Sequence, residues 1–154
     1  MDIRDLRVQA YLCLELKAAS RDEALHELVW LCFKKGHVKS PDDILKRLIQ
    51  REAFASTSLG NGFAIPHARL PYIDNSLLTI GRSSKGIAYT PTDPHMIHLI
   101  FLLLSPEGED PGHLHMLARI VRLLKDAAFT SELMAAATEK DFSRALEKQN
   151  IEVL

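Results

Sequence analysis

One stretch of the chain, residues 51–70, contains most of the side chains that could carry chemistry. In chain order these are an arginine, two hydroxyls, a Gly-x-Gly corner and a proline–histidine pair: Arg51, Ser56, Thr57, Gly60, Gly62, Pro66 and His67. A neutral imidazole can act as a nucleophile at neutral pH, because its pKa lies at about 6.5. Arginine, hydroxyls and glycine amides are common donors around a phosphate group. These residue types suit a site where a phosphoryl group meets a histidine.

His67 is expected where a strand ends. Residues 63–65 form a short apolar run that is typical of a buried strand. The proline that follows lacks a backbone N–H and restricts the residue before it to extended conformations. We therefore predict that the backbone leaves the sheet at His67, with the side chain rigidly held and open to a partner. Taken alone, this local pattern is more typical of an ordinary turn histidine.

The order of these motifs resembles the signature of the type 2 EIIA domain of the bacterial phosphotransferase system, the fructose/mannitol family. That signature consists of Arg-Glu, Ser-Thr, Gly-x-Gly and an apolar run into Pro-His, all of which this chain contains. The family also has a His-Leu pair at the start of a later helix, matched here by His113-Leu114. The residues around that pair are most similar to the nitrogen-regulatory members. Because the resemblance extends over nearly the whole chain, we expect residues 1–154 to form one EIIA-type domain.

The resemblance implies a role for each of these residues. His67 is the residue that the family phosphorylates, on Nε2, so that Nδ1–H is left to be oriented by a backbone carbonyl or a carboxylate. Arg51 is expected to donate to phosphate oxygens as a planar fork. His113 is expected to add a second imidazole, as a hydrogen-bond donor or as a positive charge. Further donors are expected from two hydroxyls and two backbone amides, those of Ser56, Thr57, Gly60 and Gly62. Neither a metal nor a cofactor is expected, because transfer between two histidines needs none.

Simpler structural roles compete with these. Arg51 could instead be a positive charge that balances the macrodipole at a helix C-terminus. Ser56 and Thr57 could be hydroxyls that stabilise a turn. The pair His113-x-His115 resembles a metal-binding pair on a strand, but on a helix residues two apart point about 200° apart. We therefore predict no metal site, and the sequence offers no ligand cluster for a metal-dependent hydrolase.

The predicted function is that of a phosphocarrier or regulatory EIIA component with a phosphohistidine intermediate, rather than a stand-alone metabolic enzyme. His67 would accept a phosphoryl group from phospho-HPr or from the nitrogen-branch paralogue of HPr. The chain would then pass the group to an EIIB domain, or signal to a regulated transporter or kinase. The lack of a fused EIIB or membrane segment favours regulation. The alternative is an EIIA-like regulatory binding module that is never phosphorylated and that a larger transporter or regulator could contain.

Composition argues against several other classes. The 154 residues are 47% hydrophobic and 25% charged, as in an ordinary globular domain. A formal net charge of −1 and the lack of a basic run give no basis for binding nucleic acid or inserting into a membrane. Cys13 and Cys32 lie in apolar contexts without metal or redox spacing, which predicts reduced thiols in a cytoplasmic protein. The N-terminus carries charges and no signal-peptide core.

Two helices are predicted in the first third of the chain, after a loop at 1–10 and a strand at 11–16. Ser20 and Glu23 have the spacing of a capping box. Ser40 is expected to cap a second helix, with the following proline in its first turn and its end near Arg51. These helices would carry Arg51 towards the histidine segment.

The rest of the chain is predicted as strands and then helices. Strands are expected at 63–65, 77–81, 86–89 and 97–104, the last a continuous apolar run typical of a strand buried on both faces. A helix follows with Leu114, Leu117, Ala118, Val121 and Leu124 on its apolar face. Thr130 and Thr138 are expected to cap two shorter helices. This order predicts an α/β fold, a single sandwich with helices on both faces of a central sheet. The resembled family has a mixed sheet, in agreement.

Overall fold

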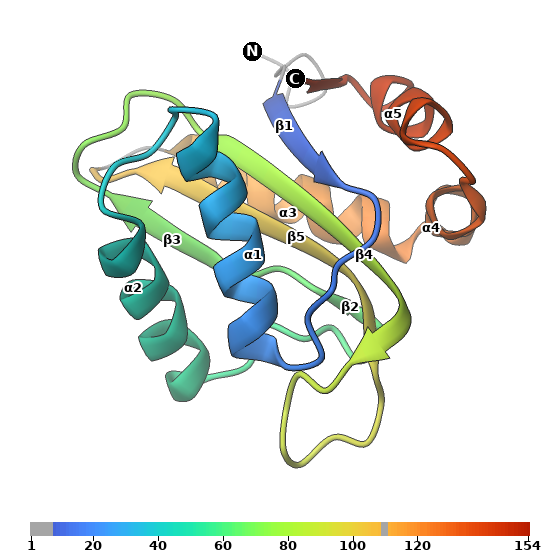
Figure 1. The fold of residues 1–154 in the computed structure, drawn as a ribbon. Coiled ribbons are helices and arrows are strands. Elements are labelled where there is room, and N and C mark those ends of the chain that lie inside the picture. Colours follow the sequence, from blue (N-terminus) through green and yellow to red (C-terminus); the bar gives the residue numbers. More distant parts are fainter. Residues whose placement is uncertain (1–7, 109–110) are drawn as a thin grey trace.

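The computed structural model describes residues 8–108 and 111–154, which form an α/β sandwich (Figure 1). Within these residues the chain contains six strands and five helices. In chain order they are β1 (Val8–Cys13), α1 (Arg21–Lys34), α2 (Pro41–Phe54), β2 (Phe63–Ala64), β3 (His67–Leu70), β4 (Leu77–Ile87), β5 (Ile97–Pro106), α3 (Pro111–Lys125), α4 (Ala127–Ala135), α5 (Glu139–Glu147) and β6 (Ile151–Val153). No helix in the described part is both long and apolar enough to span a bilayer.

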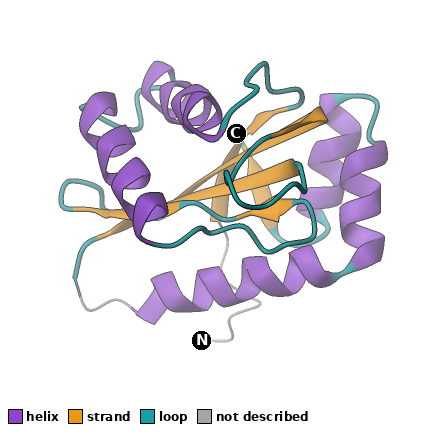
Figure 2. Ribbon diagram, turned by 90° about the horizontal axis from the view of Figure 1, so that it is seen from below, coloured by secondary structure: helices purple, strands orange, loops and turns teal. Residues whose placement is uncertain are grey.

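The described strands form one mixed sheet in the order β2-β5-β4-β1-β6, with β3 also paired to β5. Only the central pair, β4 and β5, is antiparallel, and the other pairs of this described sheet are parallel. Helices α1 and α2 cover one face, and α3 covers the other together with α4 and α5 (Figure 1). Figure 2 shows helices on both sides of the strands. The predicted fold class is therefore confirmed.

β5 carries the core of both layers, because successive side chains of a strand point to opposite faces. Along its central part, Ile100, Leu102 and Leu104 pack with α1 and α2. Three others pack with the C-terminal helices, namely Leu99, Phe101 and Leu103. All six are fully buried, as expected of a continuous apolar run in a central strand. This doubly buried strand is the rigid element beside which the histidine segment lies.

His67 lies at the start of a strand, so the prediction that the backbone leaves the sheet there is wrong. β2 and β3 follow one another along the same side of β5, with Phe63 opposite Leu99 and His67 opposite Leu103. Pro66 separates the two strands, yet its carbonyl still accepts the Leu103 N–H at 2.9 Å. The missing proline N–H is tolerated because this is an edge of the sheet.

The two predicted helix starts differ in their capping. The Ser20 hydroxyl accepts the Glu23 N–H at 3.3 Å, and the Glu23 carboxylate accepts the Ala19 N–H at 3.0 Å. This confirms the capping box, with its return bond shifted by one residue. Ser40 instead adopts a left-handed conformation, with φ of 51°, and its hydroxyl caps no amide of α2 within the described chain. The prediction of Ser40 as a side-chain cap is wrong, and α2 continues to Phe54, past Arg51.

The face that α3 turns inward is only partly the one predicted: Leu117, Val121 and Leu124 pack against the core, whereas Leu114 and Ala118 are exposed. Its buried side chains include His113, Met116, Ile120 and Leu124, whereas Leu114 is 64% exposed. Two apolar stripes were available on this helix, and the buried one contains the histidine. The prediction of Leu114 as a core residue is therefore wrong. As a result, His113 points towards the sheet.

The C-terminal helices begin at Asp126 and Thr138. The Asp126 carboxylate accepts the N–H groups of Ala128 and Phe129, so it is the cap of α4. Thr130 lies inside that helix, and the prediction of Thr130 as a cap is wrong. Thr138 is the cap of α5, as predicted, and accepts the Asp141 N–H at 3.1 Å.

Three strand predictions need correction. β4 is one long strand to Ile87, with a register shift after Arg82, where two shorter strands were predicted. β1 begins at Val8, so the loop predicted for residues 1–10 is wrong at 8–10, and its residues 1–7 lie outside the described residues. β1 ends at Cys13, so the strand predicted for 11–16 is wrong at 14–16. β6 was not predicted, because three residues give too short a pattern. It pairs with β1 and places the C-terminal end of the chain in the sheet.

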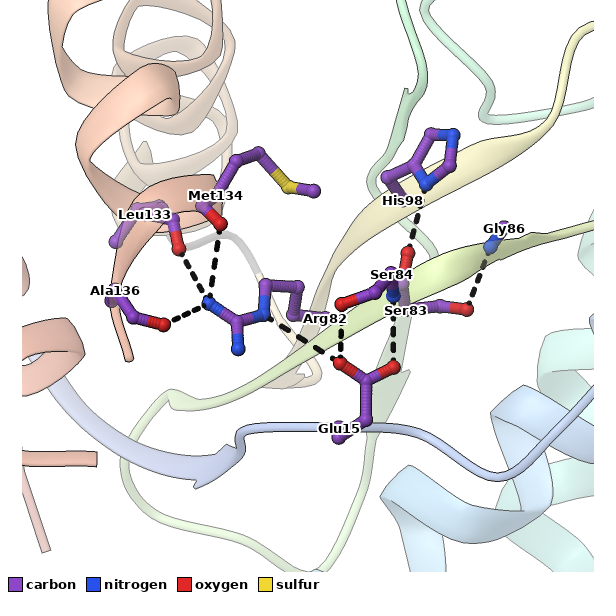
Figure 3. A network of polar contacts seen from close by, with 9 residues as sticks. All are labelled: Glu15, Arg82, Ser83, Ser84, Gly86, His98, Leu133, Met134 and Ala136. Carbon is purple, nitrogen blue, oxygen red and sulfur yellow. Dashed lines mark hydrogen bonds and ion pairs between the residues drawn. The ribbon is translucent and has the colours of Figure 1, made fainter. Parts of the chain in front are cut away.

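A buried arginine ties the sheet to α4 (Figure 3). Arg82 on β4 donates to the carbonyls of Leu133 and Ala136 at 2.9 and 2.6 Å. Glu15 lies 3.8 Å from the Arg82 guanidinium and accepts both the N–H and the hydroxyl of Ser84, at 2.8 and 2.6 Å. These bonds satisfy carbonyls at the end of α4 and hold the C-terminal helices against the sheet.

Candidate functional site

The Gly-x-Gly corner is the turn of a small hairpin. Gly60 and Gly62 have φ of +80° and +87°, which residues other than glycine rarely adopt. The turn folds residues 57–59 back along residues 63–65. The Leu59 N–H donates to the Phe63 carbonyl at 2.8 Å, and the Ile65 N–H donates to the Thr57 carbonyl at 3.2 Å. The hairpin therefore holds the segment that leads into His67 from the side opposite β5.

The imidazole of His67 is held in one tautomer. It is half-buried, and its Nδ1 lies 2.8 Å from the Ile65 carbonyl oxygen. Because a carbonyl oxygen can only accept, Nδ1 carries the proton, and in the neutral ring the lone pair is therefore on Nε2. Pro66 is the one residue between donor and acceptor, so this bond is formed within the segment that joins β2 to β3. The geometry therefore selects Nε2 as the nucleophilic atom of the neutral imidazole.

His113 lies beside His67. The two ring centroids are 5.6 Å apart and the rings are inclined by 54°. His113 is only 5% exposed, and its Nδ1 lies 2.7 Å from the Ser105 hydroxyl, which in turn accepts from Ser76 at 3.3 Å. Sequence reasoning missed Ser105, although a polar residue directly after a buried apolar run was a usable signal. β5 and α3 thus bring together two histidines that are distant in sequence.

Arg51 is placed at the end of α2. Its guanidinium donates to the Ala55 carbonyl at 2.8 Å, one of the orphan carbonyls of the helix terminus. The described residues give it no hydrogen bond to His67. This contact is the structural role at the helix C-terminus that the sequence analysis set beside phosphate binding. The two roles are compatible, because arginine has five N–H donors.

The remaining predicted supports have local partners. Ser56 accepts the Ser58 N–H at 3.1 Å, as a turn hydroxyl does. The Gly60 N–H donates to the Ser58 hydroxyl at 3.4 Å, and the Gly62 carbonyl accepts the His98 N–H at 2.7 Å. Thr57 is buried and faces away from solvent. Within the described chain, none of these groups forms a hydrogen bond with His67.

Thr57 belongs to a buried polar cluster that was not predicted. The Glu52 carboxylate, only 4% exposed, accepts the Thr57 N–H at 3.0 Å, the Thr57 hydroxyl, and the Tyr89 hydroxyl at 2.9 Å. Burial, and then the nearby Glu52 charge, raise the pKa of the Tyr89 hydroxyl well above its usual range. Tyr89 therefore stays protonated and remains a donor to the carboxylate. This cluster joins α2 to the hairpin beside the histidine segment.

The described residues contain no group of three or more His, Cys, Asp and Glu side chains arranged to hold a metal ion. The chemistry available in the described site is that of the two imidazoles and their hydrogen-bond partners.

Comparison with known protein families and proteins gives one consistent result. The model of the family described as "Phosphoenolpyruvate-dependent sugar phosphotransferase system, EIIA 2" matches residues 9–149. A nitrogen regulatory protein of Bradyrhizobium diazoefficiens is 35% identical over 138 residues, which cover 88% of each chain. The fructose-specific EIIABC component of Bacillus subtilis is 29% identical over 139 residues. That match covers 90% of this chain but only 22% of the EIIABC component, which is much longer.

Solved structures agree at the level of the fold. The nitrogen regulatory protein IIA-Ntr of Neisseria meningitidis aligns with a TM-score of 0.74 at 24% identity, over 96% of this chain and 92% of that one. A complex of enzyme IIAMTL with phosphorylated enzyme IIBMTL from Escherichia coli aligns with a TM-score of 0.73 at 18% identity. This alignment covers 89% of this chain and 94% of the matched one.

Proposed function

Since this chain belongs to the type 2 EIIA family of the phosphoenolpyruvate-dependent sugar phosphotransferase system, we propose that it accepts a phosphoryl group on Nε2 of His67. The phosphocarrier and regulatory role is that of the family. One observation carries the assignment to His67, namely the bond from Nδ1 to the Ile65 carbonyl, which leaves Nε2 with its lone pair. A histidine held in the other tautomer would have no nucleophile at Nε2.

The transfer step uses the described groups as follows. The Nε2 lone pair of His67 forms a bond to phosphorus while the N–P bond of the donor breaks, and the electrons of that bond remain on the donor nitrogen. Positive charge develops on the His67 ring, which strengthens the hydrogen bond from Nδ1–H to the Ile65 carbonyl. The neighbouring His113 supplies a donor or a positive charge to the phosphoryl oxygens. Arg51, Ser56, Thr57, Gly60 and Gly62 remain proposed supports, with Arg51 the strongest because its guanidinium can bind two oxygens at once.

The partners follow from the same family. EIIA proteins exchange phosphoryl groups with partner proteins, and the solved complex joins enzyme IIAMTL to phosphorylated enzyme IIBMTL. For this chain we propose phospho-HPr, or the nitrogen-branch paralogue of HPr, as the donor. Downstream we propose an EIIB domain, or a transporter or kinase that senses the phosphate. The match to a nitrogen regulatory protein over 88% of both chains supports the regulatory form.

We further propose that residues 1–154 act as one EIIA-type domain in the cytoplasm. The family match over residues 9–149 and the pairing of β6 with β1 support a single unit. Cys13 and Cys32 are both free thiols, which suits a reducing compartment. Burial raises the pKa of the Cys32 thiol to about 11, so this thiol stays protonated and unreactive.

The test is covalent labelling in a reconstituted system. The chain is incubated with phosphoenolpyruvate, the general phosphotransferase enzyme and HPr, and the product is weighed by mass spectrometry. One phosphoryl group should be added, labile in acid and stable in base as phosphoramidates are. His67→Ala should remain folded and accept none, whereas His95→Ala, which alters an exposed loop histidine, should label like the wild type.

Two results would contradict the proposal. Stoichiometric labelling of His67→Ala would move the acceptor to another histidine. A wild-type chain that stays unlabelled with both HPr and its nitrogen-branch paralogue would favour the non-phosphorylated binding module instead.

A further inference from the structure

The Glu52 cluster is connected to the nucleophilic histidine by three hydrogen-bonded steps that run through the backbone of Thr57 and Ile65. Glu52 on α2 binds both the N–H and the hydroxyl of Thr57. The Thr57 carbonyl accepts the Ile65 N–H at 3.2 Å. The Ile65 carbonyl then accepts Nδ1–H of His67 at 2.8 Å. The carboxylate therefore lies at the far end of the same chain of contacts that fixes the His67 ring.

The carbonyl under His67 is held from two sides. On one side the Pro66 carbonyl accepts the Leu103 N–H of β5 at 2.9 Å, which ties the segment to the buried centre of the sheet. On the other side the Ile65 N–H donates to the Thr57 carbonyl, the only backbone hydrogen bond described between Ile65 and residues 57–59. Thr57 is in turn fixed by Glu52, and its hydroxyl also lies 3.2 Å from the Tyr89 hydroxyl. The β5 side is a backbone pairing, so the Glu52 side is the one that a side chain controls.

A buried carboxylate is a costly way to hold a hairpin. Removing a carboxylate from water is unfavourable, and apolar side chains of similar volume often stabilise a fold as well or better. Unlike an apolar side chain, Glu52 can fix the orientation of the groups that it binds. Its two oxygens accept the N–H and the hydroxyl of one residue and so fix the orientation of the Thr57 peptide.

We propose that Glu52 is a positioning residue for phosphoryl transfer: through Thr57 and the Ile65 backbone, it keeps His67 in the tautomer that leaves Nε2 free. The inference rests on the proposed function of His67. Glu52 acts by hydrogen bonding and not by its charge, since Thr57 and Ile65 separate the carboxylate from the imidazole.

Three variants separate these roles. Glu52→Leu removes both acceptors and should release the Thr57 peptide. Glu52→Gln keeps one oxygen for the Thr57 N–H, and its amide can donate to the two hydroxyls, so it should behave like the wild type although the charge is lost. Thr57→Val keeps the volume and removes only the hydroxyl, so it should shift in the same direction as Glu52→Leu but by less. This third variant keeps the test valid if Glu52→Leu does not fold.

The first readout is the His67 tautomer, measured by ¹⁵N NMR of the unphosphorylated protein. We expect a detectable Nε2–H population in Glu52→Leu and none in wild type or Glu52→Gln. His98 provides a control in the same spectrum, because its Nδ1 also lies 2.8 Å from a carbonyl, that of Ser83, outside the Glu52 path (Figure 3). The His98 tautomer should not change in any variant.

The second readout is the rate of phosphoryl acceptance from phospho-HPr. Partners that orient metal-binding imidazoles are worth about 10- to 100-fold in affinity or activity, and we expect a loss at the lower end of this range for Glu52→Leu. The matched control is Glu15→Leu, which removes a carboxylate that likewise binds the N–H and hydroxyl of one residue, Ser84 (Figure 3). Neither Glu15 nor Ser84 is part of the Glu52 path. This variant should leave the rate unchanged.

The inference and the proposed function can fail separately. The tautomer is measured without a donor, so it tests the Glu52 path even if His67 proves not to be the acceptor. A folded Glu52→Leu protein with a wild-type His67 tautomer and a wild-type rate would overturn the inference while leaving His67 as the acceptor. If Glu52→Leu is unfolded, an unchanged tautomer in Thr57→Val has the same consequence. A Glu52→Gln protein as impaired as Glu52→Leu would show that charge acts instead of hydrogen bonding.

Discussion

The two histidines of the site are oriented by different kinds of acceptor, and this difference fits different roles. His67 bonds to a carbonyl, which accepts only and therefore imposes one tautomer. His113 bonds to the Ser105 hydroxyl, which can donate or accept and so serves either tautomer and the protonated ring. The neutral His67 ring is thus confined to the tautomer that leaves Nε2 as the nucleophile. His113 can change its protonation without losing its partner, which suits a group that follows the charge of a phosphoryl group.

Replacing the supporting residues should therefore affect the rate more than the fold. His113→Gln keeps a donor but cannot become cationic, and Arg51→Lys keeps the charge but loses the planar fork. The difference between a charge-assisted and a neutral hydrogen bond is about 1–2 kcal/mol, which corresponds to transfer roughly tenfold slower. For His113→Gln we expect acceptance from phospho-HPr to persist and onward transfer to be slowed more.

Quench-flow rates in both directions, beside a denaturant melt of each variant, measure this prediction. Wild-type rates in both folded variants would mean that His67 works without these two residues.

At the scale of elements, α1 and α2 both begin after a serine, but the two serines act differently. Ser20 and Ser40 both precede a helix and looked equivalent in sequence. In the structure Ser20 caps α1 through its side chain. Ser40 does not cap α2 in this way, and its backbone is left-handed, with φ of 51°, at the end of the turn between α1 and α2. At α2 the Asp43 N–H donates to the Ser40 carbonyl at 3.1 Å, so a backbone oxygen takes the place of the side-chain cap. Both helices help to place Arg51 and Glu52.

Substitutions should separate the two serines clearly. Ser20→Ala removes the acceptor of the Glu23 N–H and should lower the free energy of unfolding by about 1 kcal/mol. Ser40→Gly relieves a left-handed conformation that is unfavourable for other residues, and we expect no loss of stability, because this relief offsets the greater freedom of glycine in the unfolded chain.

Urea unfolding of both variants, followed by circular dichroism, measures the two changes. A loss in Ser40→Gly as large as that in Ser20→Ala would contradict the assignment of capping to Ser20 alone.

At the scale of the whole molecule, the sandwich explains which parts of the site could be predicted. The layer order followed from local signals, namely capping, helical periodicity and the apolar run of β5. The meeting of His67 and His113 could be expected only from the family resemblance, because sequence spacing says nothing about which helix crosses which strand. The choice of the Ile65 carbonyl as the partner of the His67 ring followed from neither, since it depends on the backbone conformation around Pro66. The Glu52 cluster and Ser105 were missed because tertiary contacts, which sequence does not show, give them their roles.

The most direct test of the account is the position of the phosphoryl group on the imidazole ring. The chain is phosphorylated with phospho-HPr, and the phosphohistidine is assigned by ¹⁵N and ³¹P NMR in the intact protein. We expect one phosphohistidine, at His67, with phosphorus bonded to Nε2 and Nδ1 still protonated and bonded to the Ile65 carbonyl. Phosphorus on Nδ1 of His67, or on the ring of any other histidine, would contradict the account, because the structure leaves Nε2 of His67 as the nucleophile.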